Sequence, residues 1–145
     1  MPTRLARTAW TGSLMEGSGQ VSLTSSSTGT FDVSFPRRIN EKSEGVTSPE
    51  ELIAAAHSSC YAMQLSAVIA EAGGVPIALQ VTAEAALMPD PAGGWKISSI
   101  ALSVRGEVEG LDAIGFATAA EKAKETCPVS KALTGTVITL DAALA

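Results

Sequence analysis

The sequence predicts one α+β domain over residues 1–145, in which antiparallel sheets pack around a long, buried central helix. Residues 52–70 contain no Asp, Glu, Lys or Arg. Strand-like segments lie on both sides of this run and are joined mainly by turn residues, an arrangement typical of antiparallel sheets. A chain of 145 residues with 46% hydrophobic content is long enough to bury one core. The predicted order of elements is βββ-α-ββ-α-β.

Three strands are expected before the central helix. Residues 30–35 alternate between apolar and polar side chains, which predicts a half-buried strand with Phe35 on its apolar face. Residues 4–10 and 20–24 show weaker strand patterns beside turns that contain glycine. Residues 36–47 form the most charged part of the chain, and we expect a loop there.

The central helix is expected to begin at Ser48-Pro49-Glu50-Glu51 and to end at Gly73-Gly74. A serine N-cap, a proline at the first helical position and two carboxylates in the first turn all favour a helix start. Paired glycines end a helix readily. Polar residues such as His57 and Gln64 interrupt the apolar run, and alanine supplies much of the rest. These features predict a core helix, buried on nearly all sides, and not a transmembrane span.

The second half of the chain is expected to form a hairpin, two helices and a last strand. The apolar phase slips at Ser98-Ser99 within the hairpin, which predicts a β-bulge there. Pro128 is expected to end the longer helix and to open a short one. The expected elements are strands over 77–88 and 95–106, helices over 111–126 and 128–133, and a strand over 136–140.

Composition limits the classes of partner and the compartment. Ten Lys and Arg against fifteen Asp and Glu give a net charge of −5, which argues against nucleic acid or an anionic membrane as the main partner. Two cysteines are too few for the disulfide framework of a small secreted protein. The N-terminus has no apolar stretch resembling a signal peptide. We therefore expect a cytoplasmic protein, and we predict no cofactor.

The two cysteines are the candidates for chemistry. Cys60 lies in the middle of the central helix, where the helix dipole has little effect, so a reactive thiolate there needs a nearby cation. Arg37, Arg38 and His57 are the candidates for that cation. Cys127 directly precedes Pro128 and so occupies the N-cap position of the short helix, where unpaired amides favour a thiolate.

Other interpretations remain open at this point. His57 lies three residues before Cys60 on the same helix, which is poor geometry for a Cys–His protease and fits a core histidine better. Cys60, Cys127 and His57 could form a zinc-binding module, although no CxxC spacing supports it. The chain could also be a non-catalytic, stress-related binding or structural protein whose cysteines are incidental or form a static disulfide.

Three segments carry a resemblance to a known family. The run from Ser48 to Cys60 closely resembles the central-helix motif of the OsmC/Ohr family, the osmotically inducible and organic hydroperoxide resistance proteins. Cys127-Pro128-Val129-Ser130 resembles the second-cysteine motif of that family, and Phe35-Pro36-Arg37-Arg38 resembles its Phe-x-x-Arg segment. The Ala56-His57 pair is similar to the OsmC branch. The resemblance covers essentially the whole chain and implies an OsmC-like fold.

The resemblance also implies a thiol-dependent peroxidase that reduces organic hydroperoxides. Cys60 would attack the hydroperoxide and become a sulfenic acid, and Cys127 would condense with it to form a disulfide. A lipoyl-type or other small dithiol would then reduce that disulfide. Arg38, or the adjacent Arg37, would lower the pKa of Cys60 and stabilise charge on the peroxide, while Glu50 would orient the arginine.

We further expect a homodimer. Glu50 and Cys60 lie ten positions apart on one helix, which corresponds to about 15 Å of axial rise. One arginine cannot easily reach both groups within a single straight helix. The helix is also too apolar to be covered by a sheet of modest size, and a two-fold partner would cover it. The family resemblance implies the same result, an intertwined homodimer with sites at the interface.

Overall fold

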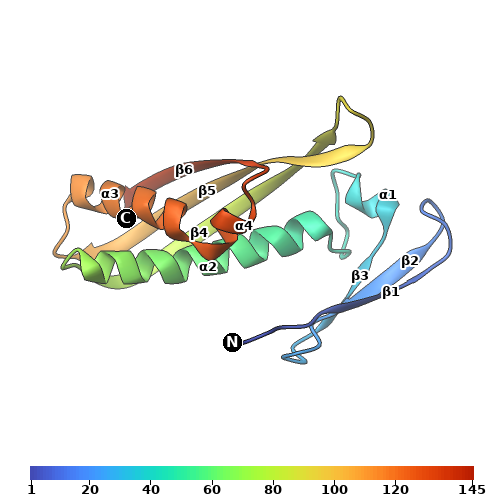
Figure 1. The fold of residues 1–145 in the computed structure, drawn as a ribbon, viewed down its shortest axis with the longest axis horizontal. Coiled ribbons are helices and arrows are strands. Elements are labelled where there is room, and N and C mark those ends of the chain that lie inside the picture. Colours follow the sequence, from blue (N-terminus) through green and yellow to red (C-terminus); the bar gives the residue numbers. More distant parts are fainter. The chain divides into compact units, whose positions relative to one another are not determined.

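The computed structural model of the protein describes all 145 residues, Met1–Ala145, and Figure 1 shows the order of its helices and strands. The chain divides into two units, Met1–Leu52 and Ile53–Ala145. Each unit has its own three-stranded sheet. The α+β class expected from the sequence is confirmed. The single domain over 1–145 stays a prediction.

The first unit contains an antiparallel sheet in the order β1-β2-β3. Its strands are β1 (Arg7–Thr11), β2 (Ser18–Ser22) and β3 (Thr30–Val33). Val21 in β2 pairs with Thr8 in β1 and with Phe31 in β3. The three expected strands are therefore present, with bounds shifted by a few residues.

A short helix, α1 (Phe35–Arg38), replaces the end of the expected third strand and the start of the expected loop. Ser34 caps this helix, because its hydroxyl accepts a hydrogen bond from the Arg37 amide at 3.4 Å. A proline in the first turn also favours the helix. The prediction that Phe35 continues the strand was wrong, because these local start signals override the alternating pattern.

The long helix α2 (Pro49–Glu71) follows, and its start and end agree with the prediction to within two residues. The Ser48 hydroxyl accepts a hydrogen bond from the Glu51 amide at 3.1 Å, as expected of an N-cap. Tyr61 and Leu65 on one face of α2 are fully buried, whereas Met63 is 73% exposed. The sequence predicted a helix buried on nearly all sides. That prediction was wrong, because one face of α2 is exposed in this chain. Its length and hydropathy alone would also suit a membrane span.

The sheet of the second unit has the order β4-β5-β6. Strands β4 (Val75–Pro89) and β5 (Trp95–Glu109) are antiparallel, and the pairing passes over Ser98 between Ser99 and Ile97. This confirms the bulge expected at Ser98-Ser99. Strand β6 (Val137–Leu144) pairs with β5 in parallel, so the expectation of antiparallel sheets was wrong for this last strand. The helices between β5 and β6 form a crossover, which permits parallel pairing.

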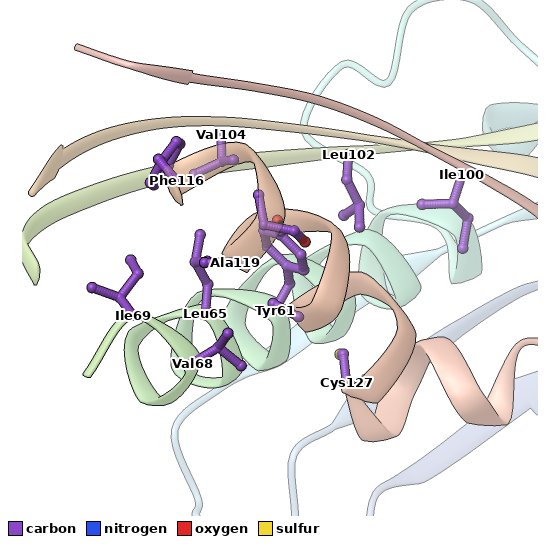
Figure 2. Packing of buried hydrophobic residues seen from close by; sticks show 12 residues of the cluster. Tyr61, Leu65, Val68, Ile69, Ile100, Leu102, Val104, Phe116, Ala119 and Cys127 are labelled. Carbon is purple, nitrogen blue, oxygen red and sulfur yellow. Dashed lines mark hydrogen bonds between the residues drawn. The ribbon is translucent and has the colours of Figure 1, made fainter. Parts of the chain in front are cut away.

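Those two helices are α3 (Ala113–Thr126) and α4 (Pro128–Ala132). Helices α2 and α3 contribute to one buried cluster with the β5 side chains Ile100, Leu102 and Val104 (Figure 2). Phe116 of α3 and Cys127, at the junction of α3 and α4, belong to the same cluster. The core of the second unit thus lies between its sheet and its helices, and it contains one of the two cysteines.

Candidate active site

Hydrogen bonds from side chains of α2 join this helix to α3 and α4. His57 bonds Ser130, Tyr61 donates to the Ala120 carbonyl, and Gln64 donates to Thr126. His57, in the first half of α2, pairs with Ser130 of α4, whereas Glu71, at the end of α2, accepts a hydrogen bond from Lys122 of α3. Helix α2 therefore runs antiparallel to the α3–α4 segment. This register places Cys60 opposite Cys127, although the two lie far apart in the sequence.

Cys127 lies at the junction of two helices. It is both the C-cap of α3 and the N-cap of α4, and Pro128 stands at the start of α4. The expected helix junction is confirmed. The Cys127 side chain is fully buried, and its backbone amide donates to the Ala123 carbonyl at 2.9 Å. The backbone on both sides of the thiol is thus fixed by helical hydrogen bonds.

The Cys60 thiol is half-buried and unoxidised, and four influences act on its pKa. Burial raises this pKa most, since it disfavours the thiolate. A hydrogen bond with the Cys127 thiol and the charge of that group raise it further. The Val129 amide, in the first turn of α4, bonds the Cys60 sulfur and lowers its pKa. None of these influences is a cation.

The Cys60 and Cys127 thiols are neighbours in the core of the second unit, and two neighbouring reduced thiols can form a disulfide. Both cysteines are free. The amide of Val129 favours negative charge on Cys60, the more accessible of the two sulfurs. The second unit thus supplies a paired dithiol in which Cys60 is the one that an external oxidant can reach.

A second pair of candidate residues meets in the first unit. Arg38, at the end of α1, donates from Nε to the Glu50 Oε1 and Oε2 atoms at 3.0 and 3.2 Å, and from Nη2 to Oε1 at 2.7 Å. Glu50 is only 7% exposed. An arginine held by two nitrogens on one buried carboxylate has a fixed orientation.

The neighbouring arginine has a different environment. Arg37 forms an ion pair with Glu44, in which both side chains are exposed (39% and 54%). Exposed ion pairs of this kind contribute little to stability or position. The structure therefore distinguishes two adjacent arginines that the sequence left as alternatives, because Arg38 alone is fixed by a buried partner.

An open, apolar cavity of about 400 Å³ lies beside Arg38 within the first unit. Its walls include Trp10, Leu14, Phe35 and Leu52. Sequence reasoning did not find this cavity, since its lining comes from strands, a turn and two helix starts. The only sign of the cavity in the sequence was the scattered apolar residues of those segments. The cavity offers space for an apolar group next to a guanidinium.

His57 is fully buried, and burial lowers its pKa. Its Nε2 atom lies 2.8 Å from the Ser130 hydroxyl, while its Nδ1 atom has no hydrogen-bond partner. No group of three or more His, Cys, Asp or Glu side chains is placed to hold a metal ion. The structure thus brings Cys60 and Cys127 together in one unit and Arg38 and Glu50 in the other. His57 contacts Ser130, a partner that sequence reasoning missed.

Comparisons with known proteins give consistent findings. The family model described as "OsmC-like protein" matches residues 42–141. The chain is 40% identical to peroxiredoxin OsmC of Escherichia coli over 132 residues, 91% of this chain and 90% of that protein. It is 34% identical to organic hydroperoxide resistance protein OhrA of Bacillus subtilis, covering 78% and 79% of the two chains. The solved structure of Bacillus subtilis OhrB matches with a TM-score of 0.74 and 26% identity over 95% of this chain and 97% of that one.

Proposed function

The chain belongs to the OsmC-like protein family, and from this premise we propose that it is a thiol peroxidase that reduces organic hydroperoxides to alcohols. The observation that carries the proposal is that Cys60 and Cys127, both free thiols, are neighbours in the core of the second unit. A relative named a peroxiredoxin and another named for organic hydroperoxide resistance support it.

The first step oxidises Cys60. Its thiolate attacks the distal oxygen of ROOH, so that an S–O bond forms and the O–O bond breaks. The leaving alkoxide takes up a proton and departs as the alcohol ROH. Cys60 loses two electrons and becomes a sulfenic acid. Its half-buried sulfur, bonded by the Val129 amide, suits this role better than the fully buried Cys127.

The second step forms the disulfide. The Cys127 sulfur attacks the sulfenic sulfur of Cys60, the S–S bond forms, and the hydroxyl leaves as water with the proton of the Cys127 thiol. An external dithiol then reduces the disulfide by thiol–disulfide exchange. We propose a lipoyl-type or other small dithiol as that reductant, because either carries the two thiols that exchange needs.

We assign Arg38 as the cation that makes Cys60 reactive, with Glu50 holding it in place. Burial and Cys127 both raise the pKa of Cys60, and the Val129 amide opposes them. A guanidinium near the sulfur would favour the thiolate and stabilise charge that develops on the peroxide oxygen. Arg38 is held by a buried carboxylate, whereas Arg37 is paired at the surface.

The cavity beside Arg38 supports an organic hydroperoxide as the substrate. Its walls are mainly apolar, with Trp10, Leu14 and Phe35 among them. An alkyl or aryl hydroperoxide would place its organic group against these side chains and its peroxide group toward the guanidinium. Hydrogen peroxide has no group to fill this space, so we expect it to be the poorer substrate.

We also propose that the active unit is a cytoplasmic homodimer. On α2, the exposed Met63 lies among small side chains, and Val75 and Ile77 at the start of β4 are each 51% exposed. A second copy of the chain would cover this apolar area. Mixing Cys60→Ser with Arg38→Ala subunits then tests whether each site takes its cysteine and its arginine from different chains. Restored activity in the heterodimer would show that it does.

The test of the proposed function compares variants in a steady-state assay. Wild type should consume cumene hydroperoxide in the presence of dithiothreitol, and hydrogen peroxide more slowly. Cys60→Ser should be inactive, while Ser59→Ala, an exposed neighbour on the same helix, should match wild type. A Cys60→Ser protein that keeps full activity would refute the proposal and favour a non-catalytic protein. Zinc in a native mass spectrum would favour the metal-binding alternative.

A further inference from the structure

Two hydrogen bonds flank the cysteine pair, one on each side. His57 precedes Cys60 by one helical turn on α2, and its partner Ser130 follows Cys127 by one turn on α4. On the other side, Gln64 donates to the Thr126 hydroxyl at 3.0 Å. The cysteine contact thus lies between two side-chain links that join the same two segments.

The His57–Ser130 link is the more buried of the two. His57 is fully buried and Ser130 is 7% exposed. The His57 Nδ1 atom has no partner, and an unsatisfied buried nitrogen destabilises a fold. A role in filling the core does not account for a histidine here, because an apolar side chain would fill the same space without leaving a buried nitrogen unsatisfied. Holding α4 at a fixed position on α2 does account for it.

We propose that His57 and Ser130 are positioning residues for the disulfide-forming step. The link fixes the first turn of α4, which carries both the Cys127 side chain and the Val129 amide that bonds Cys60. Neither His57 nor Ser130 takes part in the chemistry. This inference rests on the proposed function, because it assigns a role within the same cycle.

The consequence concerns the lifetime of the sulfenic acid. If α4 is held in place, Cys127 reaches the sulfenic sulfur before a second hydroperoxide does. If α4 moves, a second ROOH can oxidise the sulfenic acid to a sulfinic acid and leave as ROH, which removes the enzyme from the cycle. The link would thereby protect Cys60 from over-oxidation.

A measurement without hydroperoxide tests the positioning directly. The 145-residue protein is equilibrated with reduced and oxidised glutathione, so that two thiols and one oxidised glutathione give the Cys60–Cys127 disulfide and two reduced glutathiones. Loss of a buried neutral hydrogen bond should lower this equilibrium constant about 3- to 10-fold in Ser130→Ala. His57→Met should show the same loss. His57→Gln, whose amide can still reach the hydroxyl, should lie closer to wild type.

Ser59→Ala is the matched control, because the Ser59 hydroxyl bonds only the Ala56 carbonyl of its own helix. Equal constants in Ser130→Ala, His57→Met and wild type would overturn the positioning role, since a purely structural link would change stability and leave this equilibrium unchanged. In a second arm, excess cumene hydroperoxide should give several-fold more sulfinic acid in Ser130→Ala than in Ser59→Ala. If wild type is not oxidised there at all, the peroxidase proposal fails, and the glutathione result still decides the positioning role.

Discussion

Replacement of the two adjacent arginines gives the sharpest test of how Cys60 becomes reactive. Arg38→Ala removes a guanidinium that three hydrogen bonds fix on the buried Glu50 carboxylate. Arg37→Ala removes an exposed ion pair with Glu44. The two changes are chemically identical and lie one residue apart, so a difference between them reports the environments that the structure assigns.

Arg38→Ala lowers the rate constant for peroxide reduction in two ways, through the fraction of Cys60 that is thiolate and through the stability of the transition state. Removing an opposite charge near a thiol raises its pKa by about 1 to 3 units, which lowers the thiolate fraction about 10- to 1000-fold at a pH below that pKa. A more basic thiolate is also more nucleophilic, which recovers about half of this loss on a logarithmic scale. Loss of a group that stabilises developing charge lowers the rate by a further factor of about 100 or more. We expect Arg38→Ala to lower the rate constant about 100-fold or more.

Arg37→Ala should change the rate constant by less than about fivefold, because an exposed ion pair contributes about 0 to 1 kcal/mol. The assay is stopped-flow reduction of cumene hydroperoxide under single-turnover conditions across a pH series, which also gives the apparent pKa of Cys60. Circular dichroism on each variant checks that Glu50, left without its partner, has not unfolded the protein. Equal losses for the two variants, or a larger loss for Arg37→Ala, would refute the assignment of Arg38.

Three further predictions concern the resolving cysteine, pH and assembly. Cys127→Ser treated with an alkyl hydroperoxide should stop at a sulfenic or sulfinic acid on Cys60, gaining about 16 or 32 Da in intact mass, and a disulfide-like loss of mass would contradict this. Burial lowers the pKa of His57, so the unfolded state binds more protons as the pH falls below the ordinary histidine pKa of about 6.5. Stability should therefore be full above that pH and fall toward pH 5 by up to about 1.4 kcal/mol per pH unit, and His57→Gln should show a shallower decline in thermal unfolding. Met63→Glu should convert a dimer of about 30 kDa into a monomer of about 15 kDa by light scattering, and a fully active wild-type monomer at micromolar concentration would end the dimer proposal.

Local signals made parts of the fold predictable from the sequence. The cap, proline and carboxylates at Ser48-Pro49-Glu50-Glu51 placed the start of α2, and Pro128 placed the junction that holds Cys127. The slip in apolar phase placed the bulge at Ser98. Each of these features depends on residues that are close in sequence, so the pattern alone contains the information.

Other features depend on contacts that the sequence pattern does not contain. The alternation of residues 30–35 predicted a strand through Phe35, although Ser34 and the following proline start a helix there. The influence of the Val129 amide on Cys60 comes from a different helix, so reasoning from the dipole of α2 alone could not find it. The pairing of His57 with Ser130 likewise depends on the antiparallel register of α2 and α4.

The central claim is that Cys60 and Cys127 carry out one redox cycle within a single chain. The most direct measurement is the intact mass of the reduced protein after treatment with one equivalent of cumene hydroperoxide, followed by alkylation of free thiols. The account predicts a loss of about 2 Da, no alkylation, and a single peptide pair linking Cys60 to Cys127. Two free thiols that both become alkylated, or disulfides found only between chains, would contradict it.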